Sequence, residues 1–335
     1  MHDPSTPRRR VALAAVAVAI AAGGLLPVAA GAGDAAAAYP QKPLRLVVPF
    51  PAGGGSDIIA RLLGRELSTM WGQPVVVENK PGASGTIGAG AVAKAAPDGY
   101  TLLLGATPLV QLQTVFKSLP YDTFRDFAPL ARIALSSDVF ATPASAQIGS
   151  VRELLAKAKA EAGKYSYGSY GNGTSAHMHG ELLRMQAHVD LTHVAYKGGA
   201  PLVQDLMSGQ VTSGFVDASG YHPAMGSAKV RPLAVTGERR LRGLPDVPTF
   251  TELGYRDFEP NGWYGLFVPA ATPKAIRDKL SVAVLAALAK PDLEKAIREQ
   301  GLESGTLGPE AFATVLRRDA EIWARIATAA KITAD

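Results

Sequence analysis

The chain has 335 residues, 47% of them apolar, with 35 glycines, 24 prolines and no cysteine. This length is enough for two ordinary domains, each with its own core. The absence of cysteine excludes disulfides, thiolate metal sites, a cysteine nucleophile and a lipoprotein anchor. The formal net charge is +5, and the positive charge is spread along the chain after its N-terminal segment, which argues against binding to nucleic acid.

The first 38 residues differ from the rest of the chain. Arg8–Arg10 is a basic segment, Val11–Ala22 is apolar, and Gly23–Ala38 is rich in small residues and offers A-x-A cleavage sites. This order is typical of a secretory signal peptide, so residues 1–38 are predicted to be removed and the mature protein to lie in the periplasm. The alternative is a membrane anchor, but the apolar segment is shorter than the about 20 residues that span a bilayer. The arginine run leaves both Sec and twin-arginine export open.

The first predicted element after this segment is a buried strand at Leu44–Val48, followed by three glycines and an amphipathic helix that begins near Ser56-Asp57. Glycines let a ligand approach the backbone closely, and the first N–H groups of a helix have no partner within the helix. Together they favour an anion site for a carboxylate or phosphate. The alternative is that Gly53–Gly55 only turn the chain. Asp57 is expected to cap the helix or to lie in its first turn.

Two similar units follow. A strand at 74–79 leads through a glycine-rich loop to a helix that ends near residue 95, and a strand at 100–104 leads through residues 105–108 to another helix. Three strand–loop–helix units in a row predict a parallel sheet of the α/β class. In such sheets ligands bind outside the carboxyl ends of the strands, so all three loops should lie at one edge.

A strand at 127–134 is predicted to leave this first domain, and a new α/β pattern then begins. It contains a helix from Ser150 to about Glu161, four further strands, and the loops 170–175 and 197–201; the strands are expected at 165–169, 190–196, 211–216 and 231–236. A strand at 263–268 should return to the first domain, and helices at about 273–289, 291–300 and 308–328 complete the chain. The predicted lobes are therefore residues 39–135 plus 263–335, and residues 136–262, joined as a hinged protein that closes on a ligand.

Five loops direct small polar residues and helix N-termini toward what could be one cleft: 50–57, 81–87, 105–108, 170–177 and 197–201. Few cations stand in them, so a ligand's negative charge would be met by backbone N–H groups and hydroxyls. The glycine spacing at 82–88 is not a dinucleotide fingerprint, and no phosphate-binding G-x-x-x-x-G-K-[ST] motif occurs, so no nucleotide or other cofactor is expected.

The segment His177-Met178-His179 suggests a metal site at first sight. Residues two apart on a helix do not face each other, however, so these histidines would not bind one ion together. No metal is predicted, and His177 is interpreted as a hydrogen-bonding partner of the ligand or as a surface residue. No G-x-S-x-G motif or other nucleophile–base spacing is present, which argues against catalysis.

Nine segments between residues 49 and 265 share the motifs of one known family. They are Pro49–Asp57 with Ala60-Arg61, Val77–Gly85, Pro97–Leu103, Asp126–Leu130, Gly171–His177, Tyr196–Ala200, Gly209–Val211, Pro245–Thr249 and Trp263–Gly265. These segments occur in the family's order and spread over most of the chain. By them the chain resembles the substrate-binding proteins of tripartite tricarboxylate transporters, also called Bug (Bordetella uptake gene) receptors.

The resemblance implies an α/β, two-lobed periplasmic binding protein of the type II-like, Venus-flytrap kind, monomeric and without enzymatic activity. Such proteins hold a small carboxylate between their lobes, often with bridging waters, and deliver it to membrane permease subunits. The ligand class would be a di- or tricarboxylate, an aromatic acid or an amino acid. The ligand-binding residues expected are Phe50, Pro51, Ala52, Gly53, Gly54, Ser56, Ser84, Thr107, Thr174, Ser175, His177 and Asp217.

Two questions stay open at this point. Asp217 could accept a hydrogen bond from a ligand's amino or hydroxyl group, or it could merely cap Ser219 and Gly220. A carboxylate in the cleft would disfavour a second carboxylate beside it. The alternative function is a periplasmic hydrolase or isomerase that uses His177 and Asp217 in the same cleft, and it differs from a receptor in that it would change its ligand chemically.

Overall fold

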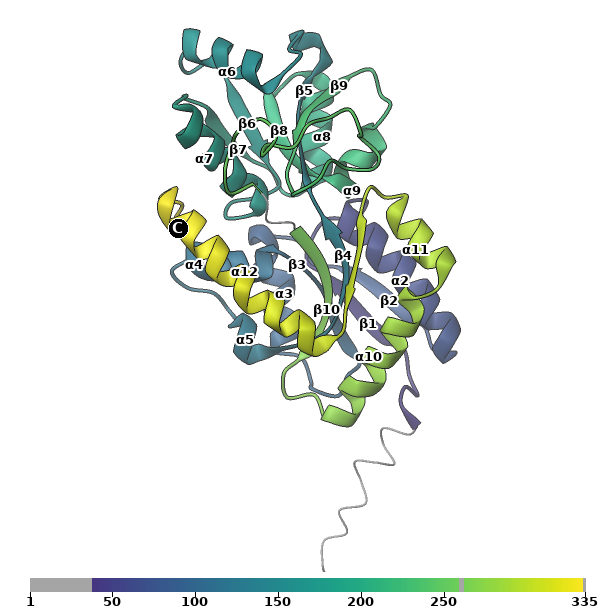
Figure 1. The fold of residues 1–335 in the computed structure, drawn as a ribbon. Coiled ribbons are helices and arrows are strands. Elements are labelled where there is room, and N and C mark those ends of the chain that lie inside the picture. Colours follow the sequence, from purple (N-terminus) through teal and green to yellow (C-terminus); the bar gives the residue numbers. More distant parts are fainter. Residues whose placement is uncertain (1–37, 259–261, 334–335) are drawn as a thin grey trace, which may run out of the picture.

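The computed structural model describes residues 38–258 and 262–333, which fold into two α/β lobes stacked one above the other (Figure 1). The predicted signal peptide lies outside the described residues, apart from its last residue. Among the residues that the structure describes, none of the helices has the length and apolar character needed to cross a bilayer.

Lobe 1 is built on a six-stranded sheet with the order β11-β4-β10-β3-β1-β2. Its strands are β1 (Leu44–Val48), β2 (Val75–Asn79), β3 (Thr101–Ala106), β4 (Phe127–Ser136), β10 (Gly262–Pro269) and β11 (Glu303–Leu307). As predicted, β1 runs parallel to both β2 and β3. The other half of the sheet is antiparallel, because β10 returns between β3 and β4 and β11 adds to the far edge.

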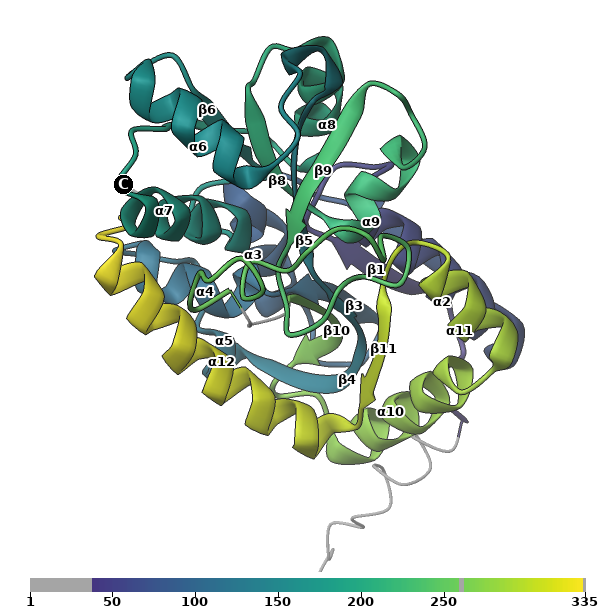
Figure 2. The ribbon, with the colours of Figure 1, turned by 45° about the horizontal axis from the view of Figure 1, so that its top comes forward.

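Helices cover both faces of this sheet (Figures 1 and 2). They are α2 (Gly55–Trp71), α3 (Thr86–Ala93), α4 (Pro108–Val115), α5 (Thr123–Asp126), α10 (Lys274–Leu288), α11 (Pro291–Arg298) and α12 (Pro309–Ala329), with a short 3₁₀ turn η1 (Ala83–Gly85). One face of the amphipathic helix α2 is buried, with Ile59, Leu63 and Leu67 fully inaccessible. This helix ends where Gly72 adopts φ 62°, a left-handed conformation that glycine takes without steric cost.

Lobe 2 contains a five-stranded sheet with the order β7-β6-β8-β5-β9. The strands are β5 (Asp138–Pro143), β6 (Ser166–Ser169), β7 (Thr192–Ala195), β8 (Ser213–Asp217) and β9 (Val230–Val235). The strands β7, β6 and β8 are parallel, and β5 runs antiparallel to β8 and β9. Its helices are α6 (Val151–Ala160), α7 (Ser175–Ala187), α8 (Gly199–Ser208) and α9 (Ala218–Tyr221), with 3₁₀ turns η2 (Ala144–Ala146) and η3 (His222–Ala224).

The chain passes between the lobes at two places that bear on the site. Strand β4 of the first sheet ends at Ser136 and β5 of the second begins at Asp138, so a single residue separates them. The second passage leads from lobe 2 into β10, in the middle of the lobe 1 sheet. Ser136 and Asp138 of the first passage and Gly262 at the start of β10 all line the cavity between the lobes.

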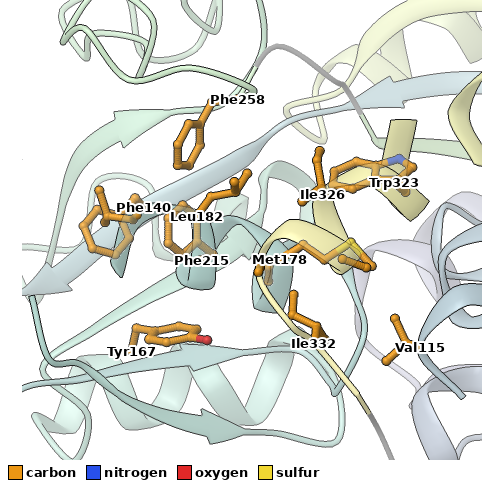
Figure 3. Close-up of a cluster of buried hydrophobic side chains, with 14 of the residues drawn as sticks. Val115, Phe140, Tyr167, Met178, Leu182, Phe215, Phe258, Trp323, Ile326 and Ile332 are labelled. Atoms are coloured by element: carbon orange, nitrogen blue, oxygen red, sulfur yellow. The ribbon is translucent and has the colours of Figure 1, made fainter. Parts of the chain in front are cut away.

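The C-terminal helix also joins the two lobes. Trp323 and Ile326 of α12 belong to the same buried cluster as Met178 and Phe215 of lobe 2 (Figure 3). Burying aromatic and aliphatic surface in this cluster stabilises the contact between α12 and α7. The helices predicted at the end of the chain are confirmed, but strands β5 and β11 are not among the predicted elements.

Candidate functional site

A cavity of about 60 Å³ lies between the lobes. From lobe 1 it is lined by Phe50, Pro51, Gly54, Gly55, Ser56, Ala106, Thr107, Pro108, Ser136, Gly262, Trp263 and Tyr264. From lobe 2 it is lined by Asp138, Tyr170, Gly198, Gly199, Ala200 and Asp217. None of these described residues is a lysine or arginine, so the wall contains no permanent cation.

Three helix N-termini meet at this cavity. Helix α2 begins after Gly54, α4 after Thr107 and α8 after Gly198; the two glycines have no side chain that could cap a helix, and Thr107 makes no capping hydrogen bond. The first N–H groups of a helix lack partners within it and each N-terminus carries a partial positive charge, although Pro108, the first residue of α4, has no N–H to offer. Their convergence creates a site suited to an anionic oxygen without any charged side chain.

Hydrogen bonds to Asp57 hold the glycine-rich loop of residues 50–57 in its conformation. This carboxylate accepts hydrogen bonds from the Gly53 N–H at 3.0 Å, from Arg61 Nε at 2.9 Å and from Asn79 Nδ2 at 3.0 Å. Asn79 also donates to the Phe50 carbonyl at 3.1 Å. Burial acts to raise the pKa of Asp57, but the hydrogen bonds from Arg61, Gly53 and Asn79 outweigh it and the pKa is lowered. Asp57 thus lies in the first turn, as expected, and supports the loop as a carboxylate.

The lobes contact each other through direct hydrogen bonds around the cavity. Ser84 Oγ of lobe 1 donates to the Asn172 carbonyl of lobe 2 at 2.8 Å. Gln111 Nε2 of α4 donates to Ser175 Oγ of α7 at 2.8 Å, and both side chains are buried. These bonds join the two lobes directly.

Asp217 of lobe 2 takes part in a polar contact between the lobes. Its Oδ2 accepts from Tyr264 Oη of lobe 1 at 2.5 Å and from Ser219 Oγ at 2.6 Å, and its Oδ1 accepts from the Gly220 N–H at 3.1 Å. Burial raises the pKa of Asp217, although the hydrogen bonds from Ser219 and Tyr264 oppose this. The capping interpretation of Asp217 is therefore confirmed, and the same carboxylate also lines the cavity.

A second acid, Asp138, lies beside Asp217 because the two residues are direct partners in the β5–β8 register. Its Oδ1 accepts from Tyr170 Oη at 3.1 Å, and its Oδ2 lies 2.8 Å from His179 Nδ1. Asp138 is 3% exposed and His179 is 1% exposed. Asp138 and Tyr170 line the cavity, whereas His179 lies behind them.

The twelve residues predicted from the sequence divide into two groups. Six line the cavity: Phe50, Pro51, Gly54, Ser56, Thr107 and Asp217. The other six, which are Ala52, Gly53, Ser84, Thr174, Ser175 and His177, are not among the residues that line it. Several of these have protein partners instead, since Thr174 Oγ1 donates to the Gly171 carbonyl at 2.7 Å and Gly53 donates its N–H to Asp57.

His177 is directed to a neighbouring cluster of side chains. Its Nδ1 accepts from the Gly173 N–H at 3.0 Å, and its ring stacks on that of His193 with the centroids 4.0 Å apart. Burial lowers the pKa of His177. His193 Nε2 lies 2.7 Å from Ser169 Oγ, a hydroxyl with no solvent exposure. Within the described ranges, no group of three or more His, Asp or Glu side chains is placed to hold a metal ion.

Several residues of the cavity wall were not among the predicted binding residues. Ala106, Pro108 and Gly198–Ala200 lie in loops that were expected at the cleft, so the sequence pattern of those loops could have identified them. Tyr264 belongs to a segment expected to return to lobe 1 but had no predicted role. Asp138 had no local signal, because no glycine-rich loop or helix start stands beside it.

A family model described as the tripartite tricarboxylate transporter family receptor matches residues 59–330. The chain belongs to this family. It is 34% identical to the periplasmic binding protein BugD, with a TM-score of 0.83 and coverage of 88% of this chain and 99% of that one. It is 32% identical to Rpa4515 of R. palustris with adipate, with a TM-score of 0.85 and coverage of 88% and 99%.

A third solved structure, MatC (Rpa3494) from Rhodopseudomonas palustris with bound malate, is 29% identical, with a TM-score of 0.79 and coverage of 86% and 99%. These are solute-binding proteins, and the family is one of receptors rather than enzymes. The two-lobed fold predicted from the sequence is confirmed, and the alternative of a hydrolase or isomerase is not supported. The protein is a receptor of the tripartite tricarboxylate family.

Proposed function

We propose that this receptor captures a small carboxylate in the cavity between its lobes and delivers it to a tripartite tricarboxylate-type membrane permease. The observation that carries the proposal is the meeting of three uncapped helix N-termini at one cavity that both lobes line. The relatives solved with adipate and with malate support the same ligand class. The N-terminal sequence supports a periplasmic location, and the receptor is expected to act as a monomer.

In this proposal the wall formed by Phe50, Pro51, Gly54 and Ser56 receives one carboxylate of the ligand. The backbone N–H groups at the start of α2 supply the hydrogen bonds, and Asp57 keeps the loop in the shape that presents them. Thr107 is held differently, since its Oγ1 accepts from the Trp263 N–H at 2.8 Å and so fixes the start of α4 against β10. A hydrogen bond from a neutral backbone N–H to an ionised carboxylate is charge-assisted, and such bonds are stronger than those between two neutral groups.

A ligand screen tests the function directly. The mature protein, unfolded and refolded to remove any bound solute, is titrated with dicarboxylates, tricarboxylates, aromatic acids and amino acids while its melting temperature is followed. A ligand that binds only the folded state raises Tm by mass action. At least one acid should raise Tm and be recovered chemically unchanged. If no acid shifts Tm at any concentration, or if the acid is converted, the proposed function is wrong.

A glycine variant tests the role of the first loop. Gly54 has φ −84° and ψ 171°, which any residue adopts, and the nearest atom to an added Cβ is the Pro51 carbonyl oxygen at 3.7 Å. Gly54→Val should therefore fold normally but place methyl groups where the carboxylate approaches, and lower the affinity at least tenfold in calorimetry. Gly64→Ala in the same helix meets only ordinary contacts of 3.5 Å or more and serves as the matched control. Equal affinity in both variants would contradict the assigned role.

A further inference from the structure

The cavity wall contains a polar group that carboxylate binding at helix N-termini does not require: Asp138, which is paired with the buried His179 behind it. The two side chains lie 2.8 Å apart, and both are almost wholly inaccessible to solvent. Tyr170 adds a second hydrogen bond to the same carboxylate, and Thr236 Oγ1 accepts from the Asp138 N–H at 2.8 Å. The Asp138 carboxylate is therefore fixed in position at the cavity wall before any ligand arrives.

The surroundings of His179 determine which form of the imidazole is present. Its ring packs against Phe258 and Phe215, with ring centroids 5.4 and 5.9 Å away, and against Trp323 at 5.4 Å. These three aromatic side chains belong to the cluster in Figure 3. In the part of the chain that the structure describes, His179 Nε2 has no hydrogen-bond partner. An unpartnered charged N–H in an apolar cluster is much more costly than an unpartnered lone pair, so the neutral ring with Nδ1–H donating to Asp138 is favoured.

A neutral His179 leaves the negative charge of Asp138 uncompensated. Each carboxylate oxygen of Asp138 accepts one hydrogen bond from the protein, so each keeps a further acceptor site. Asp217 differs, because Tyr264, Ser219 and Gly220 already donate three hydrogen bonds to it and burial raises its pKa. Of about four acceptor sites on each carboxylate, two stay open on Asp138 and one on Asp217, so Asp138 has the greater acceptor capacity for a ligand.

We propose that Asp138 accepts a hydrogen bond from the ligand, so that the receptor selects carboxylic acids that also carry a hydroxyl or ammonium group. This inference rests on the proposed function. The ligand's carboxylate lies at the helix N-termini, two of which belong to lobe 1, and its donor group reaches Asp138 of lobe 2. Such a ligand joins the two lobes. An acid without a donor group leaves the buried Asp138 carboxylate next to a group that cannot donate a hydrogen bond to it.

The test compares acids that differ only in the donor group. Calorimetry on the refolded mature protein measures the Kd of three series: succinate, malate and aspartate; glutarate, 2-hydroxyglutarate and glutamate; propionate, lactate and alanine. In the series whose chain length fits, the hydroxy or amino acid should bind at least tenfold more tightly than its unsubstituted parent. An ammonium donor is identified if the amino acid binds best, and a hydroxyl donor if the hydroxy acid does.

A variant places the selectivity at Asp138. Asp138→Asn keeps an oxygen for Tyr170 but removes the negative charge, so the preference for the substituted acid should fall at least fivefold while the unsubstituted parent binds as well as before or better. Asp190→Asn, an exposed change of the same kind in lobe 2, should leave the preference unchanged. Melting curves show whether each variant is folded.

The outcomes separate this inference from the proposed function. If unsubstituted acids bind to the wild-type protein as tightly as substituted ones, the selectivity is absent and the receptor function stands. A preference that survives intact in folded Asp138→Asn also overturns the inference, because another group must then make it. If none of the acids in these series or in the wider screen binds, the proposed function and the inference fall together.

Discussion

Gly55 should be indispensable for closure of the lobes, because a side chain there would collide with lobe 2. A Cβ built on Gly55 lies 1.7 Å from Ser219 Oγ, 2.8 Å from Ser219 Cβ and 3.0 Å from Tyr264 Oη. The hydroxyl could rotate away, but the Cβ of Ser219 cannot. Since carbon atoms in contact prefer about 3.5 Å or more, Gly55→Ala must displace α9 from α2 by roughly 0.7 Å.

This displacement weakens the polar contacts at the lobe boundary. Rotation of the Ser219 hydroxyl removes its 2.6 Å bond to Asp217 within lobe 2, and the shift stretches the 2.5 Å bond between Tyr264 and Asp217, which crosses the boundary. A hydrogen bond to a charged group contributes about 1.5–3 kcal/mol. Because 1.4 kcal/mol corresponds to a factor of ten, the ligand should bind about 10- to 150-fold more weakly.

Calorimetry with the acid that binds best measures this loss, and small-angle scattering at saturating ligand shows whether the lobes still close. Melting curves should show two intact lobes, since the collision lies between them. Gly64→Ala in the same helix is the control. In the double variant Gly55→Ala, Ser219→Gly the collision with Ser219 is removed, so its affinity should match that of Ser219→Gly alone. Wild-type affinity in the single variant Gly55→Ala would refute the closure described.

Three further changes test the polar contacts. Tyr264→Phe removes one of the three donors to the buried Asp217, so Tm should fall by an amount equivalent to about 1.5–3 kcal/mol; an unchanged Tm would show that this bond adds nothing. Burial, and then His177, lowers the pKa of His193 to about 4, while an unfolded histidine titrates near 6.5. The unfolded chain therefore binds more protons between about pH 4 and 6.5, stability declines as pH falls through this window, and His193→Gln should flatten that decline in a Tm–pH series. The lowered pKa of Asp57 stabilises the fold above about pH 4 and ceases to do so as pH falls further. Asp57→Asn should thus cost more stability at pH 7 than in strong acid, and an equal loss at both would contradict this assignment.

The lobe 1 half of the cavity wall was accessible to sequence reasoning because its signals are local. An apolar strand followed by glycines and a helix start appears in one continuous stretch, so the loop at 50–57 and its neighbours could be placed at the carboxyl ends of parallel strands. Phe50, Gly54 and Thr107 line the cavity for this reason.

His177 shows the limit of local reasoning. A glycine-rich loop and a helix start placed Thr174, Ser175 and His177 at the cleft, but such a pattern does not say which side chains face it; none of the three lines this cavity, and the ring of His177 stacks on His193. Asp138 shows the opposite case. It reaches the cavity only because the chain crosses between the sheets there and pairs β5 with β8 in a register that sets it beside Asp217. Neither the crossing between the sheets nor the strand register can be predicted from a pattern in the neighbouring sequence.

The positive partial charges of the site are divided between the two lobes, and this division bears on both binding and release of a ligand. The described wall of the cavity holds no lysine or arginine, so in the proposed function the ligand's charge would be met by the ends of α2 and α4 from lobe 1 and of α8 from lobe 2. The partial charge at a helix end acts only within about one turn. When the lobes separate, α8 and Asp138 withdraw together from α2 and α4, and the ligand loses one helix end and its hydrogen-bond acceptor in the same movement. A permanent cation on one lobe would retain the ligand after opening, whereas helix ends shared between two lobes bind it strongly only while the protein is closed.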